Sequence, residues 1–498
     1  MTSRETADGT PIDDADVRRL DTKILRSSSW VAIGLGGQQL LVFASMLVLV
    51  RLLEPQDFGL VALASPFLIA LLYLQESGLG SALIYRRGDP TQAASTVLVY
   101  SPAVAIALYA AAFVAAPQVA RLFEEPDLSA VLRVLALLLV VRSVAVVPSA
   151  LLERDLRFAT RAKVELGAAV AQFGVSIALA LTGFGVWSLV IGQLVGAATS
   201  TTFYWFHTPV RPNPFQASVP TLRELIGYGR FVSAGNILNL ANTTVDNLII
   251  GRVLGVAELG YYSVAFRLAN MPVTVISNIV GRVMFSVYST LQGDIPSVRR
   301  AYVQNLQRVA ILALPVSVAL LIAARPIVLT LFGERWSSAI VPLQLLAVYG
   351  VIRSMFGPSG ELFKGLGRPS LTVLFAALYA ALVIPALLLL IRIMGLPGAP
   401  LALIVAQLGA SLPAFLMSLR MVGLSLRELA SALAAPAAPA ACVAIALIMA
   451  VELTSAMAPA VSLIVVGAFG LAAYALGAVL FARGVIVPIW ASLRARGA

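Results

Sequence analysis

Long apolar runs dominate the sequence and constrain what the chain can fold into. A helix needs about twenty mainly apolar residues to cross a bilayer, and about fourteen runs of that kind follow one another along the 498 residues. With a mean hydropathy of +0.92 and a charged fraction of 12%, the chain has too little polar surface for a soluble domain. The sequence therefore predicts an all-α polytopic membrane protein. The expected spans lie near residues 28–51, 58–83, 94–116, 128–150, 164–182, 184–206, 225–250, 258–285, 302–323, 338–356, 370–391, 397–419, 429–451 and 460–482.

Two pairs of segments indicate an internal duplication. Residues 51–64 and 252–265 share Arg, Leu, an acid, Gly and Ala in the same register, and residues 122–130 correspond in the same way to residues 331–339. Because both pairs run in the same direction, they predict two lobes related by a parallel repeat, which is one architecture of secondary transporters.

The duplication divides the chain into five expected segments. The polar, proline-rich stretch after His207 separates the two lobes, and the last two apolar runs lie outside the repeat. Within the second lobe, one helix is expected to break at residues 357–360, where Gly-Pro-Ser-Gly interrupts it before it resumes toward Phe363. The segments are a cytoplasmic tail (1–27), an N-lobe of six helices (28–206), a cytoplasmic linker (207–224), a C-lobe of six helices (225–421), and two final helices with a cytoplasmic tail (422–498).

Basic residues predict the orientation of the chain in the membrane. Lys and Arg concentrate in alternate loops, such as the loop that holds Arg154, Arg157, Arg161 and Lys163. The positive-inside rule places these loops and both termini in the cytoplasm, with the protein in the cytoplasmic (inner) membrane. The scattered cations form no basic stripe with interleaved aromatic residues, so nucleic acid is not an expected partner.

Residues for enzyme chemistry are scarce. The chain has one cysteine, Cys442, and one histidine, His207, and we find no phosphate-binding loop, dinucleotide-binding turn, nucleophile elbow or metal-ligand cluster. We therefore expect neither catalytic residues nor a metal or cofactor.

Polar residues follow one face of two consecutive apolar runs. The first run carries Asn239, Asn242 and Asp246, and the second carries Arg267 and Asn270, at spacings that return to one side of a helix. Asp246 and Arg267 are expected at similar depths. Two interpretations remain open for them: a structural ion pair between the helices, or a role in ligand binding or gating.

Two arginines occupy equivalent positions in the two lobes. An Arg near the middle of a spanning helix costs about 2.5–3.5 kcal/mol even by the lower estimates, so each needs a reason to be there. With a two-residue insertion, the second repeat pair aligns Arg142 with Arg353. Two cations that face one central cavity could hold an anionic group between them; alternatively, each anchors its own lobe. The candidate substrate-binding residues are Arg142, Arg353, Arg267, Asn239, Asn242, Asp246 and Asn270.

Several blocks resemble a known family. These blocks are residues 331–336 (Leu-Phe-Gly-Glu-Arg-Trp), followed by residues 342–346 and 353–354, together with residues 242–255 and Asp57-Phe-Gly59. They are similar to Wzx-type polysaccharide flippases of the MOP exporter superfamily, and most similar to the branch associated with colanic acid and related exopolysaccharides. The resemblance implies two helical lobes around a central cavity. It also implies that the protein moves an undecaprenyl-diphosphate-linked oligosaccharide from the cytoplasmic to the outer leaflet by alternating access, for exopolysaccharide or lipopolysaccharide synthesis. The expected partners are this substrate, membrane lipids and, as candidates, a polysaccharide polymerase and chain-length proteins.

Three other functions are weighed against this one. A cation-coupled multidrug exporter of the same superfamily is expected to have embedded carboxylates in its cavity, whereas embedded arginines are in excess here. A peptidoglycan-precursor flippase would also need cavity cations, so the sequence separates it poorly from the leading function. A membrane-embedded glycosyltransferase or polymerase would need a catalytic acid or a sizeable outer loop.

Overall fold

The computed structural model describes residues 37–76, 78–85, 90–208, 212–454 and 457–484, without the side chains of residues 76, 228–239, 241–242 and 272–283. All regular structure in these ranges is helical, so the all-α prediction is confirmed. The chain forms two compact units, Met1–Leu240 and Ala241–Ala498, with the division inside a continuous helix. The lobe and linker boundaries expected from the sequence stay predictions.

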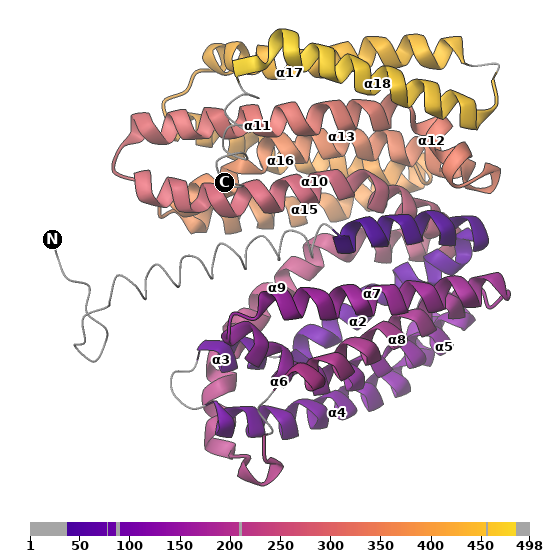
Figure 1. The fold of residues 1–498 in the computed structure, drawn as a ribbon, viewed down its shortest axis with the longest axis vertical. Helices are drawn as coiled ribbons and strands as arrows, with labels where there is room; N and C mark the ends of the chain where they lie inside the picture. Colours follow the sequence, from indigo (N-terminus) through magenta and orange to yellow (C-terminus); the bar gives the residue numbers. More distant parts are fainter. Residues whose placement is uncertain (1–36, 77, 86–89, 209–211, 455–456, 485–498) are drawn as a thin grey trace. The chain divides into compact units, whose positions relative to one another are not determined.

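The first unit contains a helix over Gly37–Leu52 and the helices that precede the division (Figure 1). These are α2 (Pro55–Glu76), α3 (Leu79–Tyr85), α4 (Thr91–Phe123), α5 (Pro126–Leu135), α6 (Leu137–Arg154), α7 (Phe158–Leu181) and α8 (Val186–His207), followed by the 3₁₀ turn η1 (Pro214–Gln216). Helix α9 (Val219–Val253) then runs from the first unit into the second.

The second unit contains the remaining helices (Figure 1). They are α10 (Val256–Leu291), α11 (Ile295–Ile322), α12 (Ala324–Leu331), the 3₁₀ segment η2 (Glu334–Ala339), α13 (Ile340–Phe356), α14 (Pro358–Gly365), α15 (Pro369–Met394), α16 (Gly398–Met421), α17 (Leu426–Leu453) and α18 (Pro459–Phe481).

Every predicted span coincides with helical structure where the structure describes it; residues 28–36 of the first span lie outside the described residues. Within the described residues, 11 helical segments are long and apolar enough to cross a membrane. The remaining predicted spans correspond to the shorter helix Gly37–Leu52 and to α9 and α10, the two helices with polar faces. The break expected at residues 357–360 is confirmed, since α13 ends at Phe356 and α14 begins at Pro358. The run 128–150 is less regular than predicted, because α5 gives way to α6 at Ala136.

Backbone geometry agrees with the duplication. Glu124 and Gly333 occupy equivalent repeat positions, and both have positive φ angles, 59° and 95°. Glycine adopts this conformation freely, whereas a side chain such as that of Glu124 is strained in it. The other repeat pair also has one local structure, because Pro55 begins α2 and Val256 begins α10 at matching points. The repeated sequences therefore mark turns that the chain makes twice.

Prolines inside the helices leave specific carbonyl groups without their helical hydrogen-bond donor, and side chains from other helices donate to several of these carbonyls. A proline has no N–H to donate to the carbonyl four residues earlier, and in a bilayer no water replaces that bond. In α4, Pro117 leaves the carbonyl of Phe113 without its helical donor. Nε of Arg133 on α5 donates to that oxygen at 3.2 Å, and the guanidinium carbon lies 4.3 Å from the centre of the Phe113 ring. Arg133 thus joins α5 to the proline site of α4.

The same arrangement occurs at three further prolines: Pro148, Pro315 and Pro436. In each case the carbonyl four residues before the proline accepts a side-chain hydrogen bond from a different helix. The bonds are Trp205 Nε1 to Val144 O at 3.0 Å, Tyr474 Oη to Ile311 O at 3.4 Å and Gln307 Nε2 to Ala432 O at 2.9 Å. The last two connect α11 to both α18 and α17, so polar bonds as well as apolar packing hold the final helix pair to α11 within the second unit.

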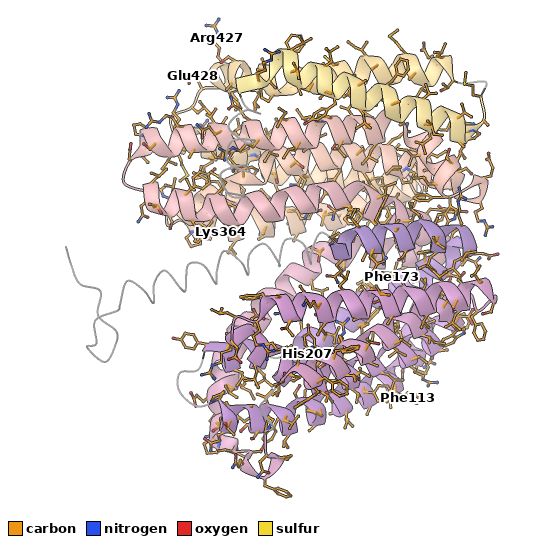
Figure 2. All side chains as sticks on the ribbon, viewed as in Figure 1. Phe113, Phe173, His207, Lys364, Arg427 and Glu428 are labelled. Atoms are coloured by element: carbon orange, nitrogen blue, oxygen red, sulfur yellow. The ribbon has the colours of Figure 1, made fainter. Side chains whose placement is uncertain are left out.

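Polar residues cap the N-termini of α11 and α17. At the start of α11, the Ser297 hydroxyl donates to Asp294 Oδ2 and the Ser297 N–H donates to Oδ1 at 3.2 Å. These bonds, that of the hydroxyl first, hold the pKa of the Asp294 carboxyl below its ordinary value. Ser425 and Glu428 form a capping box at the start of α17, and Glu428, labelled in Figure 2, also accepts from Arg299 of α11 at 2.6 Å.

Candidate functional site

Arg353 and Asn270, two of the predicted site residues, are in direct contact. Arg353 lies one turn from the end of α13, and its Nη1 donates to Oδ1 of Asn270 on α10 at 2.8 Å. The arginine side chain is partly buried. Because an amide is neutral, this bond orients the guanidinium and leaves its positive charge uncancelled. Arg353 is therefore held in a defined position while it remains able to attract an anion.

Asp246 is bound by a tyrosine rather than by the predicted arginine. Its side chain is 6% exposed, and Tyr262 Oη on α10 donates to Oδ2 at 2.6 Å. The backbone N–H of Asn247 donates to Oδ1 at 2.9 Å. The ion pair expected between Asp246 and Arg267 does not form. The reason is helical geometry, because Arg267 is five residues beyond Tyr262 and so points about 140° away from it around α10.

Arg267 lies well inside α10, eleven positions after its first residue, Val256. Its side chain is exposed and makes neither a hydrogen bond nor an ion pair with the described part of the chain. Asn270 follows three residues later, about 60° around the helix, so both residues lie toward one side of α10. Together with Arg353, Arg267 gives the second unit two guanidinium groups that no carboxylate neutralises in the described ranges.

Three tyrosines that the sequence analysis did not select complete this polar cluster. Tyr349 of α13 and Tyr379 of α15 interact through their hydroxyl groups, and Tyr379 lies within electrostatic reach of Asp246 and Arg353. Tyr262 is within similar reach of both tyrosines. One sequence signal could have identified Tyr349, since it precedes Arg353 by four residues and shares its helix face. Tyr379 is separated from the others in sequence and offers no such signal.

The remaining predicted site residues are less fully described. Asn239 and Asn242 lie on the helical backbone of α9, but their side chains fall outside the described residues. Arg142 lies on α6 in the first unit; its side chain is exposed and has no polar partner among the described residues. A cavity shared by Arg142 and Arg353 stays a prediction.

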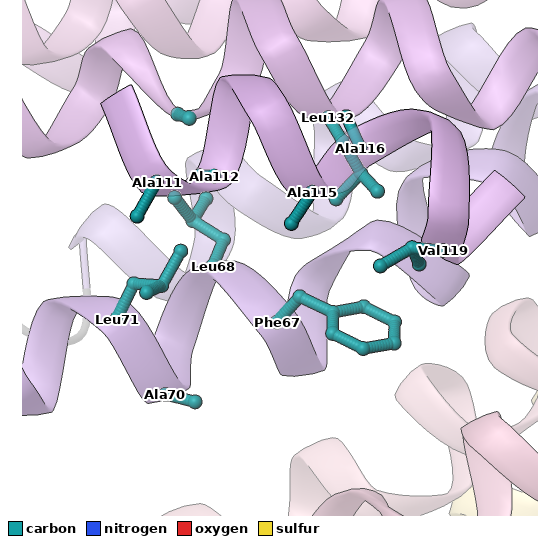
Figure 3. A pocket seen from close by; sticks show the side chains of 11 residues that line it. Phe67, Leu68, Ala70, Leu71, Ala111, Ala112, Ala115, Ala116, Val119 and Leu132 are labelled. Atoms are coloured by element: carbon teal, nitrogen blue, oxygen red, sulfur yellow. The ribbon is translucent and has the colours of Figure 1, made fainter. Parts of the chain in front are cut away.

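An apolar pocket of about 280 Å³ lies in the first unit (Figure 3). Phe67 and Leu68 of α2 face Ala112 and Ala115 of α4 across it, and Leu132 of α5 completes one wall. No charged or amide side chain lines this pocket, so it has no group that could recognise a polar ligand. The polar site is in the second unit. The described residues also contain no group of three His, Cys, Asp or Glu side chains placed to hold a metal ion.

These features define a polytopic helical membrane protein with uncompensated cations inside its spanning helices. The chain belongs to the family described as polysaccharide biosynthesis proteins, whose model matches residues 48–341. The lipopolysaccharide biosynthesis protein WzxC of Escherichia coli (strain K12) is 26% identical over 417 residues, which is 82% of this chain and 84% of that protein. The succinoglycan biosynthesis transport protein ExoT of Rhizobium meliloti (strain 1021) is 27% identical over 365 residues, 72% of each chain.

Two solved structures share the fold. The lipid II flippase MurJ in an inward closed conformation has a TM-score of 0.74 at 14% identity and covers 92% of this chain and 99% of its own. An inward-facing multidrug resistance transporter of the MATE family of the MOP superfamily has a TM-score of 0.63 at 19% identity, with 79% and 98% covered. At these identities the likeness concerns the fold alone, and it agrees with the MOP architecture expected from the sequence.

The Leu-Phe-Gly-Glu-Arg-Trp block that carries part of the family resemblance has a structural role. Trp336 is fully buried, with its ring centre 5.7 Å from that of Tyr261 and 6.3 Å from that of Phe332. Gly333 adopts the positive φ that the turn between α12 and η2 requires. This block therefore stabilises the junction before α13, the helix that carries Arg353.

Proposed function

We propose that this protein is a flippase for an undecaprenyl-diphosphate-linked oligosaccharide. It moves the repeat unit from the cytoplasmic to the outer leaflet by alternating access, for exopolysaccharide or lipopolysaccharide synthesis, and it catalyses no covalent step. Membership of the polysaccharide biosynthesis family supports this function, as do the names of WzxC and ExoT, the latter a succinoglycan transport protein. The protein lies in the cytoplasmic membrane with both termini in the cytoplasm, and a polysaccharide polymerase and chain-length proteins act with it.

The observation that carries the proposal is the pair of un-neutralised guanidinium groups, Arg267 and Arg353. A diphosphate presents several anionic oxygens, and an arginine can bind two of them at once with its planar set of donors. The neutral Asn270 orients Arg353 without competing as a counter-ion. Arg142 from the N-lobe contributes a further cation when the lobes enclose the substrate. Asn239 and Asn242 supply donors and acceptors for sugar hydroxyls.

The excess of cations also separates this function from a drug exporter. A cavity built for cationic drugs would need carboxylates that remain available, whereas Asp246 is buried and already accepts from Tyr262. A peptidoglycan-precursor flippase remains the alternative, because its substrate also carries a polyprenyl diphosphate. The two flippase functions therefore differ in the group attached to the diphosphate, and the experiment must measure which lipid-linked precursor accumulates.

The test is to delete the gene and follow lipid-linked oligosaccharides in the inner leaflet. Undecaprenyl-diphosphate oligosaccharide is expected to accumulate there while lipid-linked peptidoglycan precursor stays at its normal level. The Arg353→Ala variant should reproduce this accumulation with normal protein abundance, and Arg392→Ala, at the far end of α15, serves as the matched control. Accumulation of the peptidoglycan precursor alone would establish the alternative substrate, and unchanged levels of both lipids would refute the flippase function.

A further inference from the structure

Helices α15 and α16 pack as an antiparallel pair that is tightest at the connecting turn. A Cβ added at Gly398 would lie 2.1 Å from the carbonyl oxygen of Leu390, and a Cβ at Gly409 would lie 2.6 Å from Cδ1 of Leu382. Both distances are shorter than ordinary Cβ contacts; the Leu390 oxygen belongs to the backbone, whereas Leu382 Cδ1 is the end of a side chain that can shift. The two glycines therefore let the helices approach closely at the turn and again near the middle of the pair.

Beyond Gly409 a groove lies along α16, beside α15. It begins near Pro413 and has a volume of about 560 Å³. Phe375 forms one side and is held by stacking on Phe363, with ring centres 6.0 Å apart. The groove is apolar apart from one cation at its end. The lining residues are Phe375, Pro413, Leu416, Met417, Arg420 and Met421.

The end of this groove is positively charged. Arg420 is the penultimate residue of α16, and Arg368 immediately precedes α15 at the same end of the antiparallel pair. Both side chains are exposed, and neither has a hydrogen bond or ion pair with the described residues. The acids nearest to them in the chain are already paired, Glu361 with Lys364 at 3.1 Å and Glu428 with Arg299 at 2.6 Å.

We propose that this groove binds an anionic phospholipid, with the phosphate on Arg420 and the first part of an acyl chain between α15 and α16. Arg420 is near the end of a spanning helix, where a side chain meets the headgroup region, and anionic headgroups are attracted to cations at this level. The seven helical steps from Pro413 to Arg420 span roughly 10 Å of helix, which suits part of an acyl chain rather than a long polyprenyl chain. This site is separate from the cluster around Arg353 and does not depend on the proposed transport function.

Native mass spectrometry of the full-length protein, released from nanodiscs of phosphatidylcholine with phosphatidylglycerol, tests the assignment. Wild-type protein should retain phosphatidylglycerol in preference to phosphatidylcholine. Arg420→Gln should weaken this retention about fivefold, the effect of removing one cation from a headgroup site. Leu416→Trp keeps the charge but fills the groove, and should also reduce retention. Arg392→Gln removes an exposed arginine from the opposite end of α15 and should leave retention unchanged.

Three results would overturn the proposal. Equal retention of the two lipids by the wild type would remove the preference for an anionic headgroup. An equal effect of Arg420→Gln and Arg392→Gln would show general surface electrostatics rather than a site. Retention of added undecaprenyl phosphate in place of phosphatidylglycerol would assign the groove to the polyprenyl lipid. Because Arg420 is exposed and unpaired, its substitution leaves the fold intact, and thermal unfolding of each variant checks this directly.

Discussion

The hydrogen bond from Nη1 of Arg353 to Oδ1 of Asn270, 2.8 Å long, joins two helices across 83 residues of sequence. It positions a cation within the membrane-spanning part of the second unit without neutralising it. Both residues are candidates from the sequence for different reasons, Arg353 because of the duplication and Asn270 because it lies on a polar helix face. Their contact makes them one functional unit for mutagenesis.

Replacing Asn270 should reveal whether the charge or the position of Arg353 matters. Asn270→Asp places a carboxylate against the guanidinium and should abolish transport, because the cation then has an internal counter-ion. Asn270→Ala removes only the orienting bond and should reduce transport about tenfold or more, since hydrogen bonds to charged groups contribute about 1.5–3 kcal/mol. The measurement is inner-leaflet accumulation of lipid-linked oligosaccharide at equal protein abundance. Equal activity of the Asp and Ala variants would show that the charge of Arg353 is not used.

Arg142 and Arg353 should both contribute if the two lobes bind one diphosphate. Each Ala variant should weaken transport while the protein remains in the membrane, and Lys should rescue only partly because it lacks the planar donors of Arg. The same accumulation assay applies, with protein level followed in parallel. A fully active Arg142→Ala/Arg353→Ala double variant at normal abundance would refute the shared cavity. If only one variant has an effect, only one lobe kept the binding role after duplication.

Tyr262 should stabilise the folded protein through its hydrogen bond to the buried Asp246 carboxylate. Tyr262→Phe removes the hydroxyl donor from a buried carboxylate and should cost about 1–3 kcal/mol of unfolding free energy. Thermal unfolding in detergent measures the loss, and Asp246→Asn combined with Tyr262→Phe should recover part of it by removing the buried charge. Exchanging Asp246 and Arg267 should restore nothing, since the two residues are not paired. Full stability of Tyr262→Phe alone would mean that the bond to Asp246 contributes little.

The carbonyl of Phe113 in α4, which lacks its helical donor because of Pro117, allows a double-mutant cycle. Arg133→Met leaves the Phe113 carbonyl without a donor and should destabilise the protein by about 1–3 kcal/mol. In a Pro117→Ala background the helix regains its own N–H donor, so the same Arg133 substitution should cost clearly less. Unfolding in a denaturant or by heating measures both differences. Identical costs in the two backgrounds would show that Arg133 acts through its contact with the Phe113 ring instead.

Topology is tested with reporter fusions. A reporter that is active only in the cytoplasm should give signal when fused after Arg299 and none after Arg335, because Arg299, near the start of α11, and Arg335, in η2 beyond its end, lie on opposite sides of the membrane in the predicted topology. Signal from both positions would contradict the predicted number of crossings between them. This experiment also decides which side of the membrane the Arg420 groove faces.

The sequence by itself determined the helical class, the approximate spans, the repeated turns and the helix break before Pro358. These features are local. A bilayer forces each apolar run to satisfy its own backbone hydrogen bonds, and glycine and proline change the backbone conformation at their own positions. Of the two interpretations of Asp246 and Arg267, the ion pair was wrong, because similar depth on adjoining helices does not specify which sides of those helices meet. The rotation of α10 relative to α9 decides that, and it places Tyr262 rather than Arg267 against the carboxylate.

Only the tertiary structure decided which distant side chains meet. The contact of Arg353 with Asn270, the inclusion of Tyr379 in the polar cluster and the donors to the proline-opened carbonyls all connect helices far apart in sequence. Such pairs depend on how closely two helices approach and on their relative rotation and vertical register. Small residues such as Gly409 control the approach through packing that involves a second segment, Leu382, about which the local sequence carries no information.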